Sequence, residues 1–126
     1  MPKTVPNLPG LEPGPFPFSQ VVEANGLVFV AGQVGNAPDG HGPVPGGIEA
    51  ETRQMLDNVG RLLRIVGLDY RDVVKATVYL RDFADFPAMN TIYREYFPAE
   101  PPTRATVGVT ALAAEYRVEI EVIAAR

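Results

Sequence analysis

Two ionisable residues near the end of the chain have the types needed to act on a small anionic molecule. Arg104 is the one cation in the stretch EPPTRATVGV, and Glu119 lies in YRVEIEVI, where charged and apolar residues alternate. A guanidinium binds a carboxylate through two parallel hydrogen bonds. A carboxylate can hold and activate a water molecule. Placed together, these residues would suit a small carboxylic acid that is attacked by water.

Both residues are expected on strands, on the same face of one sheet. The prolines before Arg104 exclude a helix there, and period-2 alternation predicts strands over 103–109 and 116–123. We expect the odd-numbered residues of the first strand and the even-numbered residues of the second to face the core. Arg104 and Glu119 would then share the opposite face. The pattern alone favours a salt bridge between them at a subunit interface over a catalytic pair, because ion pairs are common.

The other elements complete a single α+β domain over 1–126. Asn25-Gly26 is typical of a hairpin turn, and Asp82 or Asp85 can cap a second helix that must end by Pro98. The order β-β-α-β-α-β-β predicts a mixed sheet with two helices on one face. The predicted elements are an extended lead-in over 1–15, strands over 20–23 and 27–34, a helix over 48–66, a strand over 73–80, a helix that carries Phe86 to Phe97, and the two strands named above.

The strand over 27–34 indicates an assembly. Its two apolar sets are Leu27, Phe29 and Ala31 on one face and Val28, Val30 and Val34 on the other. A sheet with helices on one face only should leave its other face polar. Both faces of this strand therefore need cover, and we predict that a second subunit supplies it in an obligate homo-oligomer.

Composition excludes several classes of protein. Cysteine is absent, which rules out disulfides and a thiolate nucleophile, and the single histidine, His41, lies in a Gly/Pro loop. We therefore expect no metal site. The net charge is −4, from 11 Lys+Arg against 15 Asp+Glu, so nucleic acid is not an expected partner. With no membrane-length apolar run and no secretory signal, a soluble cytoplasmic protein is expected.

The chain resembles the RidA/YjgF family, small trimeric proteins whose best characterised members are enamine/imine deaminases. The similarity runs from about Gly14 to Ala124. It implies a chorismate-mutase-like homotrimer with three pockets between neighbouring subunits. The segments that carry it are PFSQ at 17–20, FVAGQ at 29–33, DNV at 57–59, VKATVYL at 74–80, DF at 85–86, MN at 89–90, PTR at 102–104 and VEIE at 118–121, with Tyr93 and Phe97.

The resemblance also implies a site and a reaction. Arg104 would bind the substrate carboxylate, and Glu119 would position the attacking water. Asn90 would belong to the surroundings of the site, while Gly32 and Gln33 would line the pocket. The implied reaction is hydrolysis of 2-imino acids, such as 2-iminopropanoate and 2-iminobutanoate, to 2-oxo acids and ammonia, with no metal or organic cofactor.

Two positions depart from the deaminase pattern. Phe18 stands where the family usually has tyrosine, and Ala31 stands where it usually has serine. If those hydroxyls contacted substrate, their loss would cost about 1–3 kcal/mol of binding. Two alternatives therefore stay open beside the deaminase: a non-catalytic protein that binds small carboxylates, and a ribonuclease, a label that some family members carry.

Overall fold

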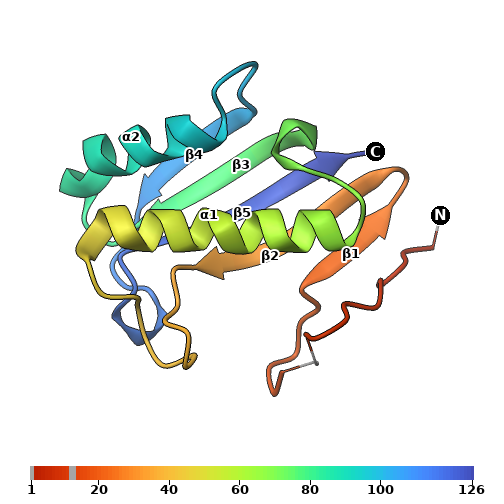
Figure 1. The fold of residues 1–126 in the computed structure, drawn as a ribbon, viewed down its shortest axis with the longest axis horizontal. Helices are drawn as coiled ribbons and strands as arrows, with labels where there is room; N and C mark the ends of the chain where they lie inside the picture. Colours follow the sequence, from red (N-terminus) through yellow and green to blue (C-terminus); the bar gives the residue numbers. More distant parts are fainter. Residues whose placement is uncertain (1, 12–13) are drawn as a thin grey trace.

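The computed structural model describes residues 2–11 and 14–126. Within them, five strands form one mixed sheet, and both α-helices cover the same face of it (Figure 1). The α+β class and the order β-β-α-β-α-β-β are confirmed. The elements are β1 (Val21–Ala24), β2 (Leu27–Val34), α1 (Gly47–Ile65), β3 (Val73–Leu80), α2 (Phe86–Tyr96), β4 (Thr103–Gly108) and β5 (Val118–Ala125).

The strand order in the sheet is β1-β2-β5-β3-β4. β3 and β4 are parallel, because the chain crosses over through α2 between them, and the other neighbours are antiparallel. β4, which carries Arg104, is therefore an edge strand. β5, which carries Glu119, lies in the centre between β2 and β3. The two candidate catalytic residues therefore lie on different strands, one at the edge and one in the centre of the sheet.

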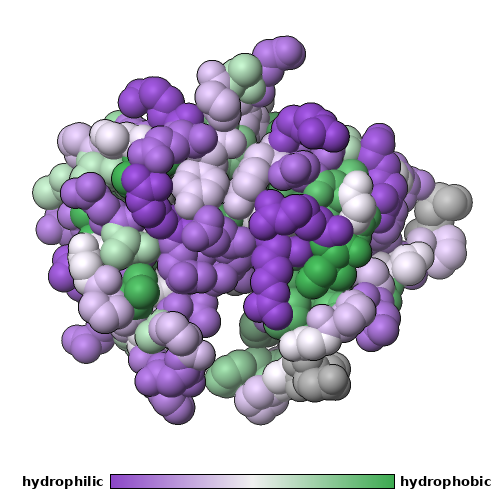
Figure 2. Space-filling model, in the orientation of Figure 1, coloured by the Kyte–Doolittle hydropathy of each residue, from purple (hydrophilic) through white to green (hydrophobic). Residues whose placement is uncertain are grey.

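The core lies between the sheet and the helices. The apolar stripe predicted for α1 is buried against the inward residues of the strands. The buried residues of α1 and of strands β2, β3 and β5 include Met55, Leu56, Val59 and Leu63 from the helix, and Val28, Val30, Ala76, Val78, Leu80, Val118, Ile120 and Val122 from the strands. Seen from the helix side, the outer surface is mostly hydrophilic, with a hydrophobic region between α1 and the lead-in (Figure 2). None of the helices described has the length and apolarity that a membrane span requires.

The hairpin turn is of the kind that the sequence predicts. Asn25 and Gly26 both have positive φ, 52° and 76°, as a type I′ turn requires. The cap of α2 differs from the expectation in part. The Asp82 carboxylate accepts a hydrogen bond from the N–H of Ala84 at 3.0 Å and caps a short 3₁₀ turn before α2, whereas Asp85 makes no side-chain cap to the helix.

The last strand begins two residues later than predicted, at Val118. The N–H of Arg117 donates to Oε1 of Glu51 at 2.8 Å instead of to a neighbouring strand. Glu51 is buried in the first turns of α1 and is also paired with the Arg117 guanidinium at 3.3 Å. A side chain of the helix therefore takes the hydrogen bond that would have extended β5.

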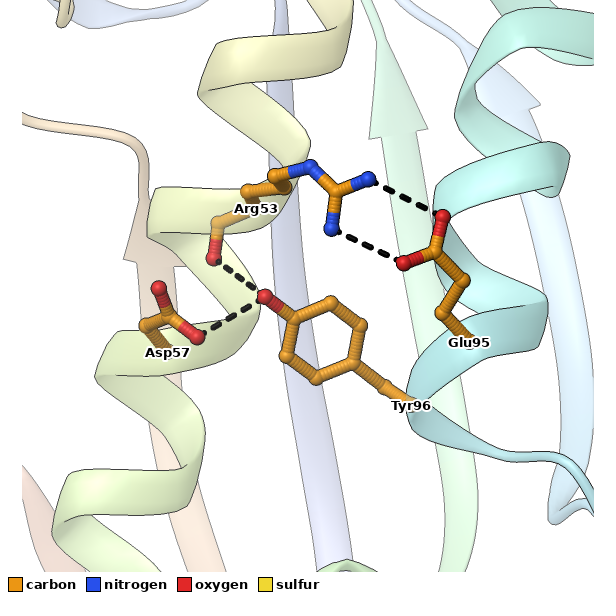
Figure 3. A network of polar contacts seen from close by, with 4 residues as sticks. All are labelled: Arg53, Asp57, Glu95 and Tyr96. Carbon is orange, nitrogen blue, oxygen red and sulfur yellow. Dashed lines mark hydrogen bonds and ion pairs between the residues drawn. The ribbon is translucent and has the colours of Figure 1, made fainter.

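Side chains of α1 and α2 lock the two helices together (Figure 3). Arg53 makes a two-fold hydrogen-bonded ion pair with Glu95, at 2.9 and 3.0 Å. The Tyr96 hydroxyl donates to Oδ1 of Asp57 at 2.8 Å. Burial and this bond to Asp57 raise the pKa of Tyr96 to about 12. These contacts fix α2, and with it the side chains that α2 presents to β4.

The sheet face opposite the helices carries apolar side chains that no helix or strand of the described residues covers. On β2, Val28 and Val30 are buried under the helices, while Phe29 on the other face is 40% exposed. On the edge strand β4, Val107 is 41% exposed. This is the two-sided apolar pattern from which the sequence predicts an assembly, with one difference. Val34, expected on the face of Val28 and Val30, lies beyond the register shift, opposite Glu119 on the uncovered face. The assembly itself, and the number of subunits, remain predictions.

Candidate functional site

Arg104 faces helix α2, and the prediction that it shares a face with Glu119 is wrong. In the register of β3 and β4, Arg104 lies opposite Ala76, which is buried under the helices. The guanidinium carbon of Arg104 lies 4.6 Å from the ring centre of Tyr93 and 5.6 Å from that of Phe86. Both rings belong to α2. The apolar residues of β4 on which the prediction depended point to the uncovered face instead.

The guanidinium of Arg104 has no acidic partner among residues 2–11 and 14–126. Four ion pairs are found there, and none includes Arg104. It borders a hollow of about 400 Å³ between α2 and the start of β4. The hollow is lined by Asn90, Tyr93, Arg94, Phe97, Pro98, Pro101, Pro102 and Arg104. A cation beside an open hollow, with its donors free, is suited to bind an anion.

Four side-chain polar atoms of the described residues are buried without a hydrogen-bond partner. Three of them belong to α2 and β4, the elements that meet at the hollow: Oδ1 of Asn90, the hydroxyl of Tyr93 and Oγ1 of Thr106. The fourth is Oδ2 of Asp85, at the N-terminal end of α2. Asn90 and Tyr93 line the hollow with Arg104, and Thr106 follows Arg104 on the same face of β4. Burying a polar atom without a hydrogen bond costs about 1–3 kcal/mol. We therefore expect a bound molecule to form hydrogen bonds with these atoms. Burial raises the pKa of Tyr93, and the Arg104 guanidinium opposes that effect.

Glu119 lies on the other face of the sheet. It stands opposite Tyr79 on β3 and Val34 on β2, in the alternation that buries Val118 and Ile120 under the helices. Its side chain is half-buried. Burial, with a smaller contribution from the neighbouring charge of Glu121, raises the pKa of Glu119. A carboxyl with a raised pKa is a better proton acceptor near neutral pH.

Gly32 makes room for the Glu119 carboxylate. The pairing of β2 with β5 shifts between Val30 and Gln33, and Gly32 lies within this irregularity. A Cβ atom at Gly32 would collide with Oε2 of Glu119. Gln33 stabilises the same region, because its amide donates to the carbonyl of Ala31 and to Oε1 of Gln20, both at 2.9 Å. Gln33 itself lies opposite Ile120, on the helix side, and lines a separate hollow with Asn36 and Asn58. The expectation that it lines one pocket with Arg104 and Glu119 is therefore not met within a single chain.

The remaining predicted positions lie apart from Arg104. Ala31 lines a hollow of about 300 Å³ on the uncovered face, together with Lys75 and Glu121. Phe18, between the lead-in and β1, is 59% exposed. One chain thus forms two groups: Asn90 and Arg104 on the helix side, and Ala31, Gly32 and Glu119 around the uncovered face. The residues described contain no cluster of three histidine or acidic side chains that could hold a metal ion.

Sequence reasoning missed Tyr93 and Thr106 as members of the Arg104 group. Tyr93 is buried, as an apolar position on the inner face of a helix would be. Its spacing, three residues after Asn90, is the signal that places both on one face of a helix. Thr106 stands two residues after Arg104, which places both on one face of a strand.

Comparisons with known proteins show which family this chain resembles. Residues 12–126 match the family described as endoribonuclease L-PSP. Over 108 residues, or 86% of the chain, the sequence is 45% identical to "Reactive Intermediate Deaminase A, chloroplastic" of Arabidopsis thaliana and 44% identical to "2-iminobutanoate/2-iminopropanoate deaminase" of Capra hircus. The match spans 58% of the Arabidopsis protein and 79% of the goat protein.

A solved structure shows the same fold. TdcF of Escherichia coli, crystallised with bound serine, superimposes with a TM-score of 0.82 and 33% sequence identity, over 90% of this chain and 91% of that one. The family match covers far more than half of the chain. The protein therefore belongs to the endoribonuclease L-PSP family, which is the RidA/YjgF family predicted from its motifs.

Proposed function

We propose that this protein hydrolyses reactive 2-imino acids, such as 2-iminopropanoate and 2-iminobutanoate, to 2-oxo acids and ammonia. The main support for the proposal is that the Arg104 guanidinium has no acidic partner among the described residues. It also borders a hollow in which polar atoms have no hydrogen-bond partner. A substrate carboxylate would supply the missing anion. The curated relatives named as deaminases support the same reaction.

In this proposal the complete site forms between two subunits of a homotrimer. Arg104 and Glu119 lie on opposite faces of one sheet, so they cannot act on one small molecule within a single chain. Arg104 is on the edge strand β4, from which it can meet the uncovered face of a neighbouring sheet. The apolar side chains exposed on that face favour such a contact. The number three comes from the family resemblance.

The chemistry needs few groups. Arg104 of one subunit binds the substrate carboxylate by two hydrogen bonds and orients the protonated imine. A water held by Glu119 of the neighbour attacks the imine carbon, and the glutamate takes a proton from it. The carboxyl then returns this proton to the nitrogen. The C–N bond breaks, ammonia leaves, and the remaining hydroxyl loses its proton to give the 2-oxo acid.

The binding half of the proposal has further support in TdcF, which was crystallised with bound serine. Serine resembles a 2-imino acid in one respect: its carboxylate is attached to a carbon that bears nitrogen. In the proposal, Arg104 binds the carboxylate of such a molecule. The substitutions Phe18 and Ala31 remove two hydroxyls from the usual pattern. They motivate the alternative of a protein that binds small carboxylates without hydrolysing an imine.

One assay tests the reaction. A pyridoxal-phosphate dehydratase acting on threonine or serine releases the enamine and imine in solution, and formation of the 2-oxo acid is followed with and without the protein. Acceleration well above the spontaneous rate is expected. Binding of 2-oxobutanoate without acceleration would contradict the deaminase and support the binding protein. Cleavage of RNA without acceleration would contradict it in favour of a ribonuclease.

A further inference from the structure

Arg104 is held in place by aromatic rings and not by an acidic side chain. We propose that Tyr93 is a positioning residue: the face of its ring holds the Arg104 guanidinium so that the N–H donors stay free for a substrate carboxylate. This inference rests on the proposed role of Arg104 as the carboxylate anchor. Tyr93 itself is not proposed to react.

The geometry supports a cation–π contact. The guanidinium carbon lies 4.6 Å from the ring centre of Tyr93, with Phe86 as a second, more distant ring at 5.6 Å. Both distances are within the range, up to about 6 Å, over which a ring attracts a cation. In the part of the chain that the structure describes, Arg104 makes no ion pair that would compete. The rings are therefore its main support.

An aromatic support has a functional advantage over an acidic one. A carboxylate partner would occupy the same forked donors that grip a substrate carboxylate and would neutralise the charge. A ring attracts the flat face of the guanidinium and leaves the edge, with all its N–H groups, unoccupied. A free arginine side chain would lose rotamer entropy when it binds. Pre-orientation by Tyr93 removes part of that loss before the substrate arrives.

Tyr93 is itself well fixed. It is 6% exposed, and its ring packs on Phe97 with centres 4.7 Å apart. Helix α2, which carries Tyr93, is tied to α1 by the Arg53–Glu95 pair and by the bond from Tyr96 to Asp57 (Figure 3). The rigid pair of helices thus determines where the guanidinium lies. The Tyr93 hydroxyl has no partner among the described residues, so the ring, and not the hydroxyl, is assigned the positioning role.

The test compares Tyr93→Phe, which keeps the ring, with Tyr93→Leu, which removes it. Affinity for 2-oxobutanoate is measured by calorimetry, and KM and kcat are measured in the dehydratase-coupled assay. Tyr93→Leu should weaken 2-oxobutanoate binding about 5- to 30-fold, with most of the kinetic loss in KM. Tyr93→Phe should lose clearly less affinity than Tyr93→Leu, since it retains the ring face and loses only the hydroxyl.

Tyr116→Leu is the matched control, because Tyr116 is equally buried, 7% exposed, and does not line the Arg104 hollow. It should lower the melting temperature without weakening binding. If Tyr93→Leu does not fold, Phe86→Leu removes the second ring and should weaken binding about two- to fivefold. Unchanged affinity in the ring-deletion variants, or an equal loss in Tyr93→Phe, would overturn the positioning role. A wild-type protein that neither binds 2-oxobutanoate nor hydrolyses imines would overturn the proposed function as well.

Discussion

Arg104 and Glu119 lie on opposite faces of the same sheet. Arg104 turns from the edge strand β4 toward Tyr93 on the helix side, and Glu119 turns from the central strand β5 toward the uncovered face. A reaction that uses both residues on one small molecule therefore requires two copies of the chain. Contact between subunits through the apolar uncovered face would bring the free guanidinium of one copy to Glu119 of the other, as the proposed hydrolysis needs.

The first prediction concerns the anchor. Arg104→Ala should weaken binding of 2-oxobutanoate about 100-fold or more, because a two-fold charged hydrogen bond is lost, and should abolish imine hydrolysis. The melting temperature should change little, since Arg104 forms no ion pair with any described residue and its removal leaves none of them unpaired. Arg104→Lys should rescue poorly, because a point charge cannot replace the fork. Calorimetry and thermal melts measure both effects.

Arg71→Ala is the control for charge, because Arg71 is exposed on the turn before β3, away from the hollow. It should bind 2-oxobutanoate as the wild type does. Loss of stability and of assembly in Arg104→Ala, with ligand affinity unchanged, would instead support a structural ion pair between subunits. That outcome would contradict the anchor.

The second prediction concerns pH. Burial raises the pKa of Glu119 above its ordinary value, so the folded protein holds this proton more strongly than the unfolded chain. Its contribution to stability is therefore fully present below the ordinary glutamate pKa and is lost as pH rises through the raised value. Glu119→Gln should raise the melting temperature at pH 7, and this difference should disappear near pH 4. Activity of the wild type should fall as acid protonates Glu119, and a pH-independent rate would argue against its role as base.

The third prediction concerns the space beside Glu119. Gly32→Ala should lower kcat at least tenfold, because the new Cβ would displace the Glu119 carboxylate that holds the water. Binding of 2-oxobutanoate should fall less than kcat, since Arg104 is untouched. Gly14→Ala is the control, because a Cβ there meets nothing within 4 Å. Full activity in Gly32→Ala would show that the position of this carboxylate does not matter.

The fourth prediction concerns the two departures from the family pattern. Phe18→Tyr combined with Ala31→Ser restores the usual hydroxyls and should keep or raise the rate of imine hydrolysis, by up to about tenfold for one new hydrogen bond. The coupled assay measures the rate, and light scattering checks the assembly. A double variant that assembles as the wild type does but loses activity would show that these positions do not line the site.

Most elements could be predicted because their signals are local. The Asn25-Gly26 turn, the apolar stripe of α1 and the alternation in β3 and β5 each follow from a few neighbouring residues. The face of Arg104 could not be predicted in this way. Ala105 and Val107 are apolar on the uncovered face of an edge strand, and alternation cannot distinguish cover by a helix from cover by another subunit.

Which side chains of the candidate site lie next to each other depends on strand register and helix packing. Patterns of neighbouring residues in the sequence do not determine either. Gly32 and Glu119 are far apart in the sequence, and only the shifted pairing of β2 with β5 brings them together. The support of Arg104 by Tyr93 likewise requires the crossover that lays α2 beside β4. The family motifs nevertheless name Arg104, Asn90, Gly32 and Glu119 as candidates, because a motif match needs no knowledge of the register.

The fifth prediction concerns the assembly. Light scattering should give the mass of a trimer at micromolar concentration, and a stable monomer would contradict it. Val107→Asp should weaken the assembly and the activity together, because it places a charge on the uncovered apolar face. Loss of assembly with full activity would show that one chain suffices for the reaction.

Complementation between two inactive variants tests the central claim most directly. Arg104→Ala and Glu119→Gln are each purified as inactive proteins, then unfolded together, mixed in equal amounts and refolded. If each site takes Arg104 from one subunit and Glu119 from its neighbour, random mixing should restore about one quarter of the wild-type activity, because that fraction of interfaces pairs two intact residues. Each variant refolded alone should stay inactive. A mixture that forms mixed trimers and has no activity would contradict a site shared between subunits.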